Sequence, residues 1–308
     1  MKRVLFIYNR HAGKNKTWAG LTQIINAMTE QGWLVTAYPT QHPGDAGEAI
    51  VRLSAGFDRV VVAGGDGTLS EAISGAIRLP EPPVIGYIPV GTTNDFSRNL
   101  DLPSADLADL AVTAVTGEPQ VHDLGRFNGR SFVYVAAFGA FTDISYNTPQ
   151  NAKNLLGYNA YVLGALRSIP ASMLKTHRIR VEYDDQVIEG NYVYGMVSNT
   201  TSVGRFQNFP PGHPDLSDGL LEVTLISPVH NMEDMAEFIP ALLTTNPSAL
   251  DNMLTTFSTP RVKITSPDGL AWTLDGEDGG VHETAEIEVL HNAYTIVHGT
   301  GPALPPGK

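Results

Sequence analysis

The sequence predicts an α/β fold joined to an all-β fold: an N-terminal, doubly wound, parallel α/β domain and a C-terminal antiparallel β-sandwich domain. Residues 1–122 alternate apolar strand runs with amphipathic helix patterns, which is typical of a parallel sheet covered on both faces. From about Val121, short alternating runs are separated by turn residues, as in an antiparallel sandwich or barrel. The boundary is therefore predicted near 122/123, with the second domain reaching about residue 292.

Apolar runs and apolar stripes locate the elements of the first domain. Continuous apolar runs predict buried strands, and apolar residues three and four positions apart predict helices. The expected strands are 4–8, 34–38, 59–63 and 84–88, and the expected helices are 21–28, 46–53, 69–77 and 107–114.

The second domain is expected to consist mainly of short strands. These are 132–135, 179–183, 192–197, 220–226, 262–264 and 287–290, followed by a last apolar run at 293–297. Two helical patterns, 158–174 and 232–243, interrupt them. The first could line an acyl-binding wall, although core packing explains its apolar stripe as well.

Composition limits the class of protein. The chain has no cysteine, which excludes disulfides and cysteine-based zinc sites, and no apolar run reaches the roughly 20 residues that span a bilayer. The net charge of −12 argues against a nucleic-acid partner and against stable adsorption to anionic membranes. The sequence predicts a soluble, cytoplasmic protein. A small basic patch for membrane contact, or a solvated strand start, lies at Lys175, His177, Arg178 and Arg180.

The most informative motif is Gly64-Gly65-Asp66-Gly67-Thr68, between an apolar strand and an amphipathic helix. A glycine turn at a helix N-terminus makes an anion site, because backbone N–H groups and the helix dipole point into one pocket. Asp66 would repel a phosphate unless a cation lay between them. The motif therefore indicates a metal-bound nucleotide and phosphoryl transfer.

This motif resembles the nucleotide loop of the diacylglycerol kinase catalytic domain family, whose relatives include sphingosine, ceramide and NAD kinases. Other segments in the same order are similar, over nearly the whole chain, and the likeness to soluble bacterial diacylglycerol kinases is the closest. The resemblance implies that ATP is the phosphoryl donor and that the 293–297 run returns to the first domain, which would then include about 293–308. Implied nucleotide-binding residues are Gly65, Asp66, Gly67, Thr68, Leu69, Ser70, Glu71 and Thr92.

Two further segments are similar to nucleotide-contacting parts of the family. The first strand ends in Asn9-Arg10-His11-Ala12-Gly13-Lys14, which resembles the opening loop, although Arg10 stands where relatives commonly have proline. This is not a Walker A motif, because Asn15 replaces Ser or Thr. Thr40 matches a nucleotide-contacting threonine. Taken alone, Lys14 could be merely solvated and Thr40 could be a turn residue.

Two aspartates after later strands resemble members of the family's magnesium–water network. Asp95 lies in Gly91-Thr92-Thr93-Asn94-Asp95-Phe96, where Asn94 or Asp95 could instead cap the next helix. Asp123 lies in Val121-His122-Asp123-Leu124-Gly125, where an Asx-turn before a hairpin is the alternative. With Asp66, these residues are the expected carboxylates of the catalytic centre.

The second domain carries two acidic turns. By resemblance, Asp215, Asp218 and the carbonyl of Leu220 would bind a structural Mg²⁺, and oxygen ligands suit this hard cation. In Leu274-Asp275-Gly276-Glu277, the resemblance assigns Glu277 as the general base on a lipid hydroxyl, although Asp275 could take part. An ordinary turn is the alternative at both places.

Together these residues imply an Mg²⁺-dependent lipid kinase that uses ATP, phosphorylates diacylglycerol or a related lipid alcohol, and contacts the inner membrane surface transiently. Two alternatives stay open: a kinase acting on NAD or another soluble alcohol, and a non-catalytic protein that binds nucleotide or lipid. The sequence does not identify the lipid acceptor or the oligomeric state, although an exposed edge strand could support a homodimer.

Overall fold

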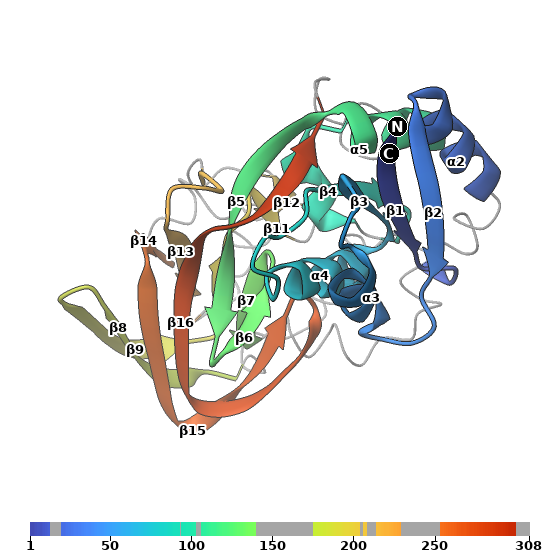
Figure 1. The fold of residues 1–308 in the computed structure, drawn as a ribbon. Helices are drawn as coiled ribbons and strands as arrows, with labels where there is room; N and C mark the ends of the chain where they lie inside the picture. Colours follow the sequence, from blue (N-terminus) through green and yellow to red (C-terminus); the bar gives the residue numbers. More distant parts are fainter. Residues whose placement is uncertain are drawn as a thin grey trace. The chain divides into compact units, whose positions relative to one another are not determined.

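The computed structural model describes residues 1–12, 20–92, 94–102, 106–139, 175–203, 206–207, 214–228 and 253–299 (Figure 1). The chain forms two compact units, Met1–Asp123 with Asn292–Lys308, and Leu124–His291. It passes from one unit to the other along the strands β5 (Glu118–Phe127) and β16 (Glu277–His298). The helices predicted at 158–174 and 232–243 lie outside the described residues. Among the described helices, none has the length and apolarity needed to cross a bilayer.

The first unit is built on a parallel sheet in the order β2-β1-β3-β4. Its strands are β1 (Lys2–Tyr8), β2 (Trp33–Pro39), β3 (Arg59–Gly64) and β4 (Ile85–Pro89). The end of β16 runs parallel to β4, with Ile296 opposite Ile85. This pairing confirms that the last apolar run returns to the first sheet. Residues 60–64 of β3 are all buried, as their continuous apolar sequence predicted.

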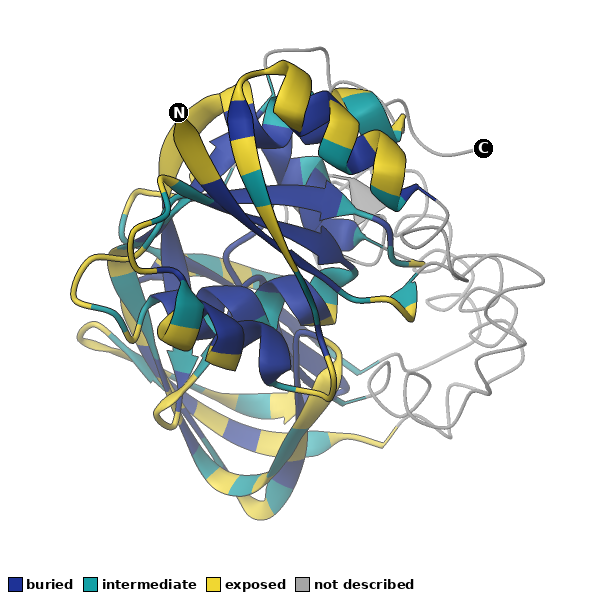
Figure 2. Cartoon of the chain, turned by 45° about the vertical axis from the view of Figure 1, so that its right-hand side comes forward, coloured by how far each residue is buried: buried dark blue, intermediate teal, exposed yellow. Residues whose placement is uncertain are grey.

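Helices cover both faces of this sheet, as expected for a doubly wound fold (Figure 1). They are α2 (Leu21–Glu30), α3 (Asp45–Leu53), α4 (Asp66–Ala76), the 3₁₀ helix η2 (Asp95–Leu100) and α5 (Leu107–Thr116). Helices α2 and α5 pack together, and α3 packs against α4. Figure 2 shows that each helix turns buried residues inward and exposed residues outward, which is the consequence of its apolar stripe.

The second unit consists of antiparallel strands. These are β6 (Arg130–Phe132), β7 (Val135–Gly139), β8 (His177–Tyr183), β9 (Gln186–Tyr192), β10 (Tyr194–Ser198), β11 (Ser202–Val203), β12 (Phe206–Gln207), β13 (Leu221–Ile226), β14 (Leu254–Thr259) and β15 (Arg261–Leu274). The first half of β15 pairs with β8 and its end pairs with β7, across a register shift after Thr265. This strand therefore pairs with different partner strands along its length. Aromatic side chains of Phe127, Phe138 and Trp272 pack in the core of this unit.

Three predicted strand boundaries were wrong. The run 132–135 is broken after Phe132, because the carboxylate of Asp275 accepts hydrogen bonds from the backbone N–H groups of residues 133–135. The run 192–197 is divided at Val193, since β9 pairs with β8 whereas β10 pairs with β7 and β13. The runs 287–290 and 293–297 are parts of the single strand β16.

Candidate nucleotide and metal site

The loops that carry the glycine motifs follow parallel strands and therefore lie at the same edge of the first sheet. β1 has β2 on one side and β3 on the other, so the chain leaves β1 in one direction and later returns on its other side. Ligands of open α/β sheets bind at such a switch point, outside the carboxyl ends of the strands. The loops after β1 and β3 meet at this point.

Asn9 connects these two loops. Its backbone N–H donates to the carbonyl of Ala63 over 2.9 Å, and its side-chain Nδ2 donates to Oγ1 of Thr68 over 3.2 Å. Its Oδ1 accepts the backbone N–H of His11 over 2.9 Å, which closes the turn containing Arg10. The predicted residues Gly13 and Lys14 lie outside the described part of the chain.

Asp66 is the first residue of α4, and its carboxylate reaches a second helix. Oδ2 accepts the backbone N–H of Asp95 over 3.0 Å, and Oδ1 accepts that of Phe96 over 3.2 Å. The side chain of Asn94, the N-cap residue of η2, does not cap this helix, so the capping alternative does not hold for Asn94. Instead Asp66 bonds to the start of η2 and joins the two glycine motifs through one anionic side chain.

Close backbone contact holds the same two motifs together. The carbonyl of Gly64 accepts the N–H groups of Val90 and Gly91 at 2.9 and 3.2 Å, and the buried hydroxyl of Tyr87 at 3.2 Å. A Cβ on Gly91 would lie 2.5 Å from the Cα of Gly65. Burial raises the pKa of Tyr87 well above its ordinary value, with Asp66 and Asp95 adding to the effect, so the hydroxyl stays a donor. Sequence reasoning missed Tyr87, which reads as an ordinary apolar strand residue.

The other predicted nucleotide residues differ in exposure. Gly67 and Thr92 are exposed, whereas Gly65, Ser70 and Glu71 are half-buried. The side chain of Leu69 is 1% exposed and belongs to the core, so only its backbone is suited to a ligand. Thr40 is buried, and its N–H donates to the carbonyl of Tyr8, which places it beside the end of β1.

Asp123 is fully buried within β5. The Asx-turn reading was therefore wrong: Oδ1 accepts the backbone N–H of Asn292 over 2.7 Å, which ties β5 to β16. The neighbouring His122 ring lies 6.2 Å from the ring of Phe96, the residue after Asp95. The first unit thus brings the strand of Asp123 next to the helix that begins at Asp95.

In the second unit, the predicted metal residues form a turn before β13. Oδ1 of Asp215 accepts the N–H and the hydroxyl of Ser217 at 3.0 and 2.9 Å. Oδ1 of Asp218 accepts the N–H of Leu220 over 2.9 Å. Each exposed carboxylate thus uses one oxygen to hold the turn, and the other oxygen is suited to a cation.

A third carboxylate, which sequence reasoning missed, lies within electrostatic range of this turn. Glu222 is 8% exposed, and its Oε2 has no hydrogen-bond partner among the described residues. Burial, together with a smaller contribution from repulsion by Asp218 and Asp215, raises its pKa to about 7. Such accumulated negative charge fits a bound cation. The sequence signal that could have identified Glu222 was the presence of a glutamate inside the apolar strand Leu220 to Ile226.

The turn between β15 and β16 places Asp275 and Glu277, whose roles the motif left undecided, in different environments. Asp275 and Gly276 have φ values of 51° and 84°, which is typical of a two-residue type I′ hairpin turn. The buried Asp275 carboxylate accepts three backbone N–H groups, from residues 133–135, at 2.7–3.2 Å. Glu277 is exposed, and no described residue hydrogen-bonds to its carboxylate. Asp275 therefore holds the structure, which leaves Glu277 available for chemistry.

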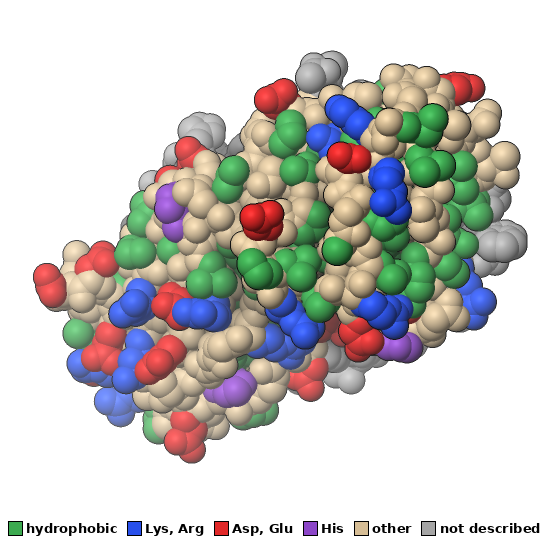
Figure 3. Space-filling view, viewed as in Figure 1, with side chains coloured by type: hydrophobic (Ala, Val, Ile, Leu, Met, Phe, Trp, Pro, Cys, Tyr) green, Lys and Arg blue, Asp and Glu red, His purple; other side chains and the backbone are tan. Residues whose placement is uncertain are grey.

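One cation of the predicted basic patch, Arg180, is neutralised by acidic neighbours. Arg180 pairs with Glu189 at 2.6 Å and with Glu182 at 3.1 Å. The ring of His177 lies against Phe138. Figure 3 shows Lys and Arg side chains mixed with Asp and Glu side chains over β8 and β9. The solvated-strand reading fits Arg180, while Lys175 and Arg178 remain exposed.

Comparison with known proteins agrees with this architecture. The family model described as the diacylglycerol kinase catalytic domain matches residues 3–127, and the YegS C-terminal NAD kinase beta sandwich-like domain matches residues 138–298. A diacylglycerol kinase of Bacillus subtilis is 32% identical over 300 residues, covering 96% of this chain and 97% of the relative. One from Staphylococcus saprophyticus is 35% identical over 73% of each chain.

Solved structures show the same fold. A crystal structure of a Bacillus anthracis protein assigned to the diacylglycerol kinases superimposes with a TM-score of 0.84 at 26% identity, covering 97% of this chain and 96% of that one. Another from the same organism gives a TM-score of 0.75 at 23% identity, over 97% of each chain. The α/β domain followed by a β-sandwich is thus the fold of this group. The chain belongs to the diacylglycerol kinase family, and it is a kinase.

Proposed function

We propose that this chain transfers the γ-phosphate of ATP to the hydroxyl of diacylglycerol or a related lipid alcohol, giving phosphatidic acid or its equivalent. The hydroxyl oxygen forms a bond to the γ-phosphorus while the bond to the bridging oxygen breaks, ADP leaves, and the hydroxyl proton passes to a carboxylate. The observation that carries this proposal is the Asp66 carboxylate, which joins two glycine loops at the switch point of a parallel sheet. Relatives named diacylglycerol kinase support a lipid as the acceptor.

Within the first unit, the loops after β1, β2, β3 and β4 would bind the nucleotide through backbone N–H groups and the N-terminus of α4. Asn9 and Thr68 hold the loops after β1 and β3 in register. Asp66, Asp95 and Asp123 are the proposed catalytic carboxylates. Magnesium would be held at these carboxylates through water, and structurally at Asp215, Asp218 and Leu220, where it would offset phosphate and carboxylate charge.

Glu277 of the second unit is the proposed proton acceptor. An exposed carboxylate is not basic enough to deprotonate an alcohol before reaction, and it need not be. Phosphoryl transfer passes through a loose transition state in which positioning dominates and the proton leaves late. The second unit thus supplies the lipid side of the reaction, with transient contact at the membrane surface.

Radioactive phosphate transfer from [γ-³²P]ATP tests the proposal. The purified protein is assayed with Mg²⁺ and mixed micelles containing diacylglycerol, monoacylglycerol, phosphatidylglycerol, a sphingoid base or ceramide. Label in the organic phase that depends on the added lipid supports a lipid acceptor. Label confined to the aqueous phase with NAD or another soluble alcohol would contradict it. ATP binding with no transfer to any acceptor would favour a non-catalytic protein.

A further inference from the structure

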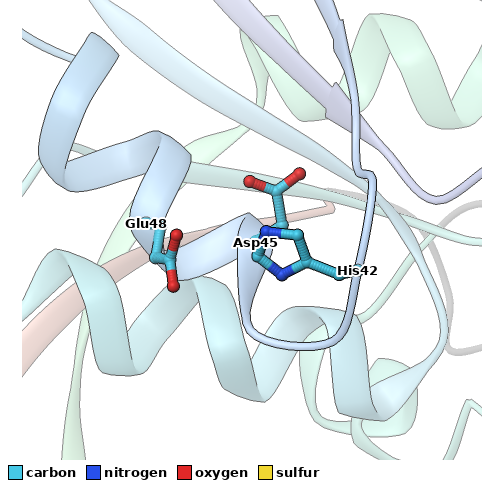
Figure 4. Close-up of side chains that lie close together, drawn as sticks. All are labelled: His42, Asp45 and Glu48. Atoms are coloured by element: carbon cyan, nitrogen blue, oxygen red, sulfur yellow. The ribbon is translucent and has the colours of Figure 1, made fainter.

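A second cluster of potential metal ligands lies at the start of α3, outside the groups assigned to phosphoryl transfer. Figure 4 shows His42, on the loop before α3, with its ring facing the first turn of that helix, from which Asp45 and Glu48 project. One ligand atom from each residue lies within 4.8 Å of the other two. From this arrangement we propose that His42, Asp45 and Glu48 form a binding site for a first-row transition-metal ion of the Zn²⁺ type.

The imidazole is already arranged as a metal-bound histidine would be. Nδ1 of His42 lies 2.9 Å from the carbonyl of Pro43, and a carbonyl can only accept, so Nδ1 carries the proton of this hydrogen bond. The neutral ring then has its lone pair on Nε2. Metal-binding histidines commonly donate their second ring N–H to a backbone carbonyl in this way, which fixes the tautomer and the ring orientation.

Hydrogen bonds from neighbouring residues hold the carboxylate of Asp45 in place. Asp45 is 2% exposed; its Oδ2 accepts the N–H of Gln41 over 2.6 Å, and its Oδ1 accepts the hydroxyl of Tyr38 over 3.1 Å. Arg52 in turn donates to the Tyr38 hydroxyl over 2.9 Å. Each carboxylate oxygen has two lone pairs, so Oδ1 can also bind a metal ion.

Glu48 provides the adjustable part of the site. Both His42 and Glu48 are exposed, and Glu48 lies three residues after Asp45, on the same face of the helix. Ligand atoms around a tetrahedral Zn²⁺ are about 3.4 Å apart, given bond lengths near 2.1 Å. Rotation of the exposed Glu48 side chain toward the Asp45 carboxylate and the His42 ring closes the remaining distance.

The helix dipole alone does not account for this cluster. Carboxylates in the first turn of a helix are stabilised by its dipole, which explains Asp45 and Glu48 without any ligand. It does not explain an imidazole whose ligand atom lies within 4.8 Å of both carboxylates. The pKa of His42 is raised, first by the hydrogen bond to Pro43 and then by Asp45, Glu48 and Glu71, so the ring lies in a negative field that attracts a cation.

One imidazole with two carboxylates suits Zn²⁺ with a water as fourth ligand, and disfavours Mg²⁺, which prefers oxygen ligands. This preference allows a selective experiment. Zn²⁺ is titrated into the full chain by calorimetry, in a large excess of Mg²⁺ that occupies the oxygen-ligand sites. Co²⁺ absorption provides a spectroscopic readout of the same site.

The expected result is one Zn²⁺ per chain, with affinity lowered at least about tenfold in His42→Asn and in Glu48→Gln, the minimum effect of perturbing a metal ligand's surroundings. Glu30→Gln, an exposed glutamate at the end of α2, is the matched control and should bind as the wild type does. Affinity should also rise with pH through the pKa of His42, since the proton and the metal compete for Nε2. Absence of binding, or unchanged affinity in both site variants, would overturn the assignment.

Discussion

The carboxylate of Asp66 accepts the backbone N–H of Asp95 over 3.0 Å, so an acidic residue from one glycine motif fixes the position of an acidic residue in the other. Two negative side chains held this way lie in the same electrostatic environment, and both act on the buried Tyr87 hydroxyl. An arrangement of this kind favours a cation between the carboxylates and the nucleotide.

Replacing Asp66 by Asn tests this link. The amide keeps one acceptor but turns an NH₂ group toward a backbone N–H, so the free energy of unfolding should fall by about 1.5–3 kcal/mol, the value of a hydrogen bond to a charged group. Lipid phosphorylation should fall by roughly 10²-fold or more, as for loss of one electrostatic stabiliser. Urea unfolding and label transfer measure the two effects.

Asp106→Asn is the matched control for this change. Asp106 caps α5 by accepting the N–H groups of Ala108 and Asp109, and asparagine caps helices about as well. Its stability and activity should therefore stay near wild type. Equal losses in both variants would show that the Asp66 contact has no special role.

Substitution of Glu277 is predicted to lower activity, whereas substitution of Asp275 is predicted to lower stability. Glu277→Gln should lower the transfer rate by about 10²–10⁴-fold, the usual contribution of a general base, with unfolding unchanged. Asp275→Asn should cost about 1–3 kcal/mol of stability, because the amide cannot accept all three N–H groups that the carboxylate accepts. Glu283→Gln, an exposed glutamate in the same strand, should change neither quantity. Full activity of Glu277→Gln would exclude it as the base.

The raised pKa of Glu222 predicts a pH dependence of stability in metal-free protein. Between pH 4.5, its ordinary value, and about 7, the folded protein keeps a proton that the unfolded chain has released. Raising the pH through this window therefore favours unfolding. Relative to Glu222→Gln, the wild type should lose roughly 1–3 kcal/mol across it and then level off.

Thermal or urea unfolding in EDTA at several pH values measures this difference. Adding Mg²⁺ should restore the stability of the wild type at high pH, because a nearby cation favours the ionised carboxylate. Parallel pH curves for wild type and Glu222→Gln would contradict the buried-carboxylate assignment.

Substitution by alanine should affect stability very differently at two glycines at the junction of the motifs. A Cβ on Gly91 would meet the Cα of Gly65 at 2.5 Å and Oδ1 of Asn94 at 2.6 Å, so Gly91→Ala should cost about 1–3 kcal/mol through backbone displacement. A Cβ on Gly65 would lie 3.4 Å from the Cα of Gly91, an ordinary contact. Gly65→Ala should therefore unfold almost as the wild type does. Similar unfolding midpoints for the two variants would show that the loops can separate freely.

Much of the fold was predictable because local patterns and burial agree. The parallel strands are buried on both faces, so their continuous apolar runs revealed β1 and β3 directly. The runs in the second unit were also recognised, but their boundaries at 132–135 and 192–197 were wrong. Those boundaries depend on Asp275 and on the choice of partner strand, which come from distant parts of the chain.

The candidate site, like the fold, could be predicted from the sequence only in part. The glycine motif pointed to Asp66 and the family resemblance to Asp95 and Asp123, and the structure joins Asp66 to the backbone of Asp95. The sequence did not reveal that the Asp66 carboxylate accepts a hydrogen bond from the start of η2, because the donor lies 29 residues away. The sequence also did not reveal Glu222 as part of the candidate site, because its pKa depends on burial and on the neighbouring turn.

By itself, the sequence determined the order of strands and helices, the glycine loops and the kinase family, since these depend on residue type and spacing along the chain. Only the tertiary structure decided which carboxylate holds backbone and which is open to a ligand: Asp275 accepts three N–H groups while Glu277 is exposed. The physical reason is that hydrogen-bond partners and burial are set by packing between segments far apart in the sequence, and these quantities fix the chemistry of a carboxylate.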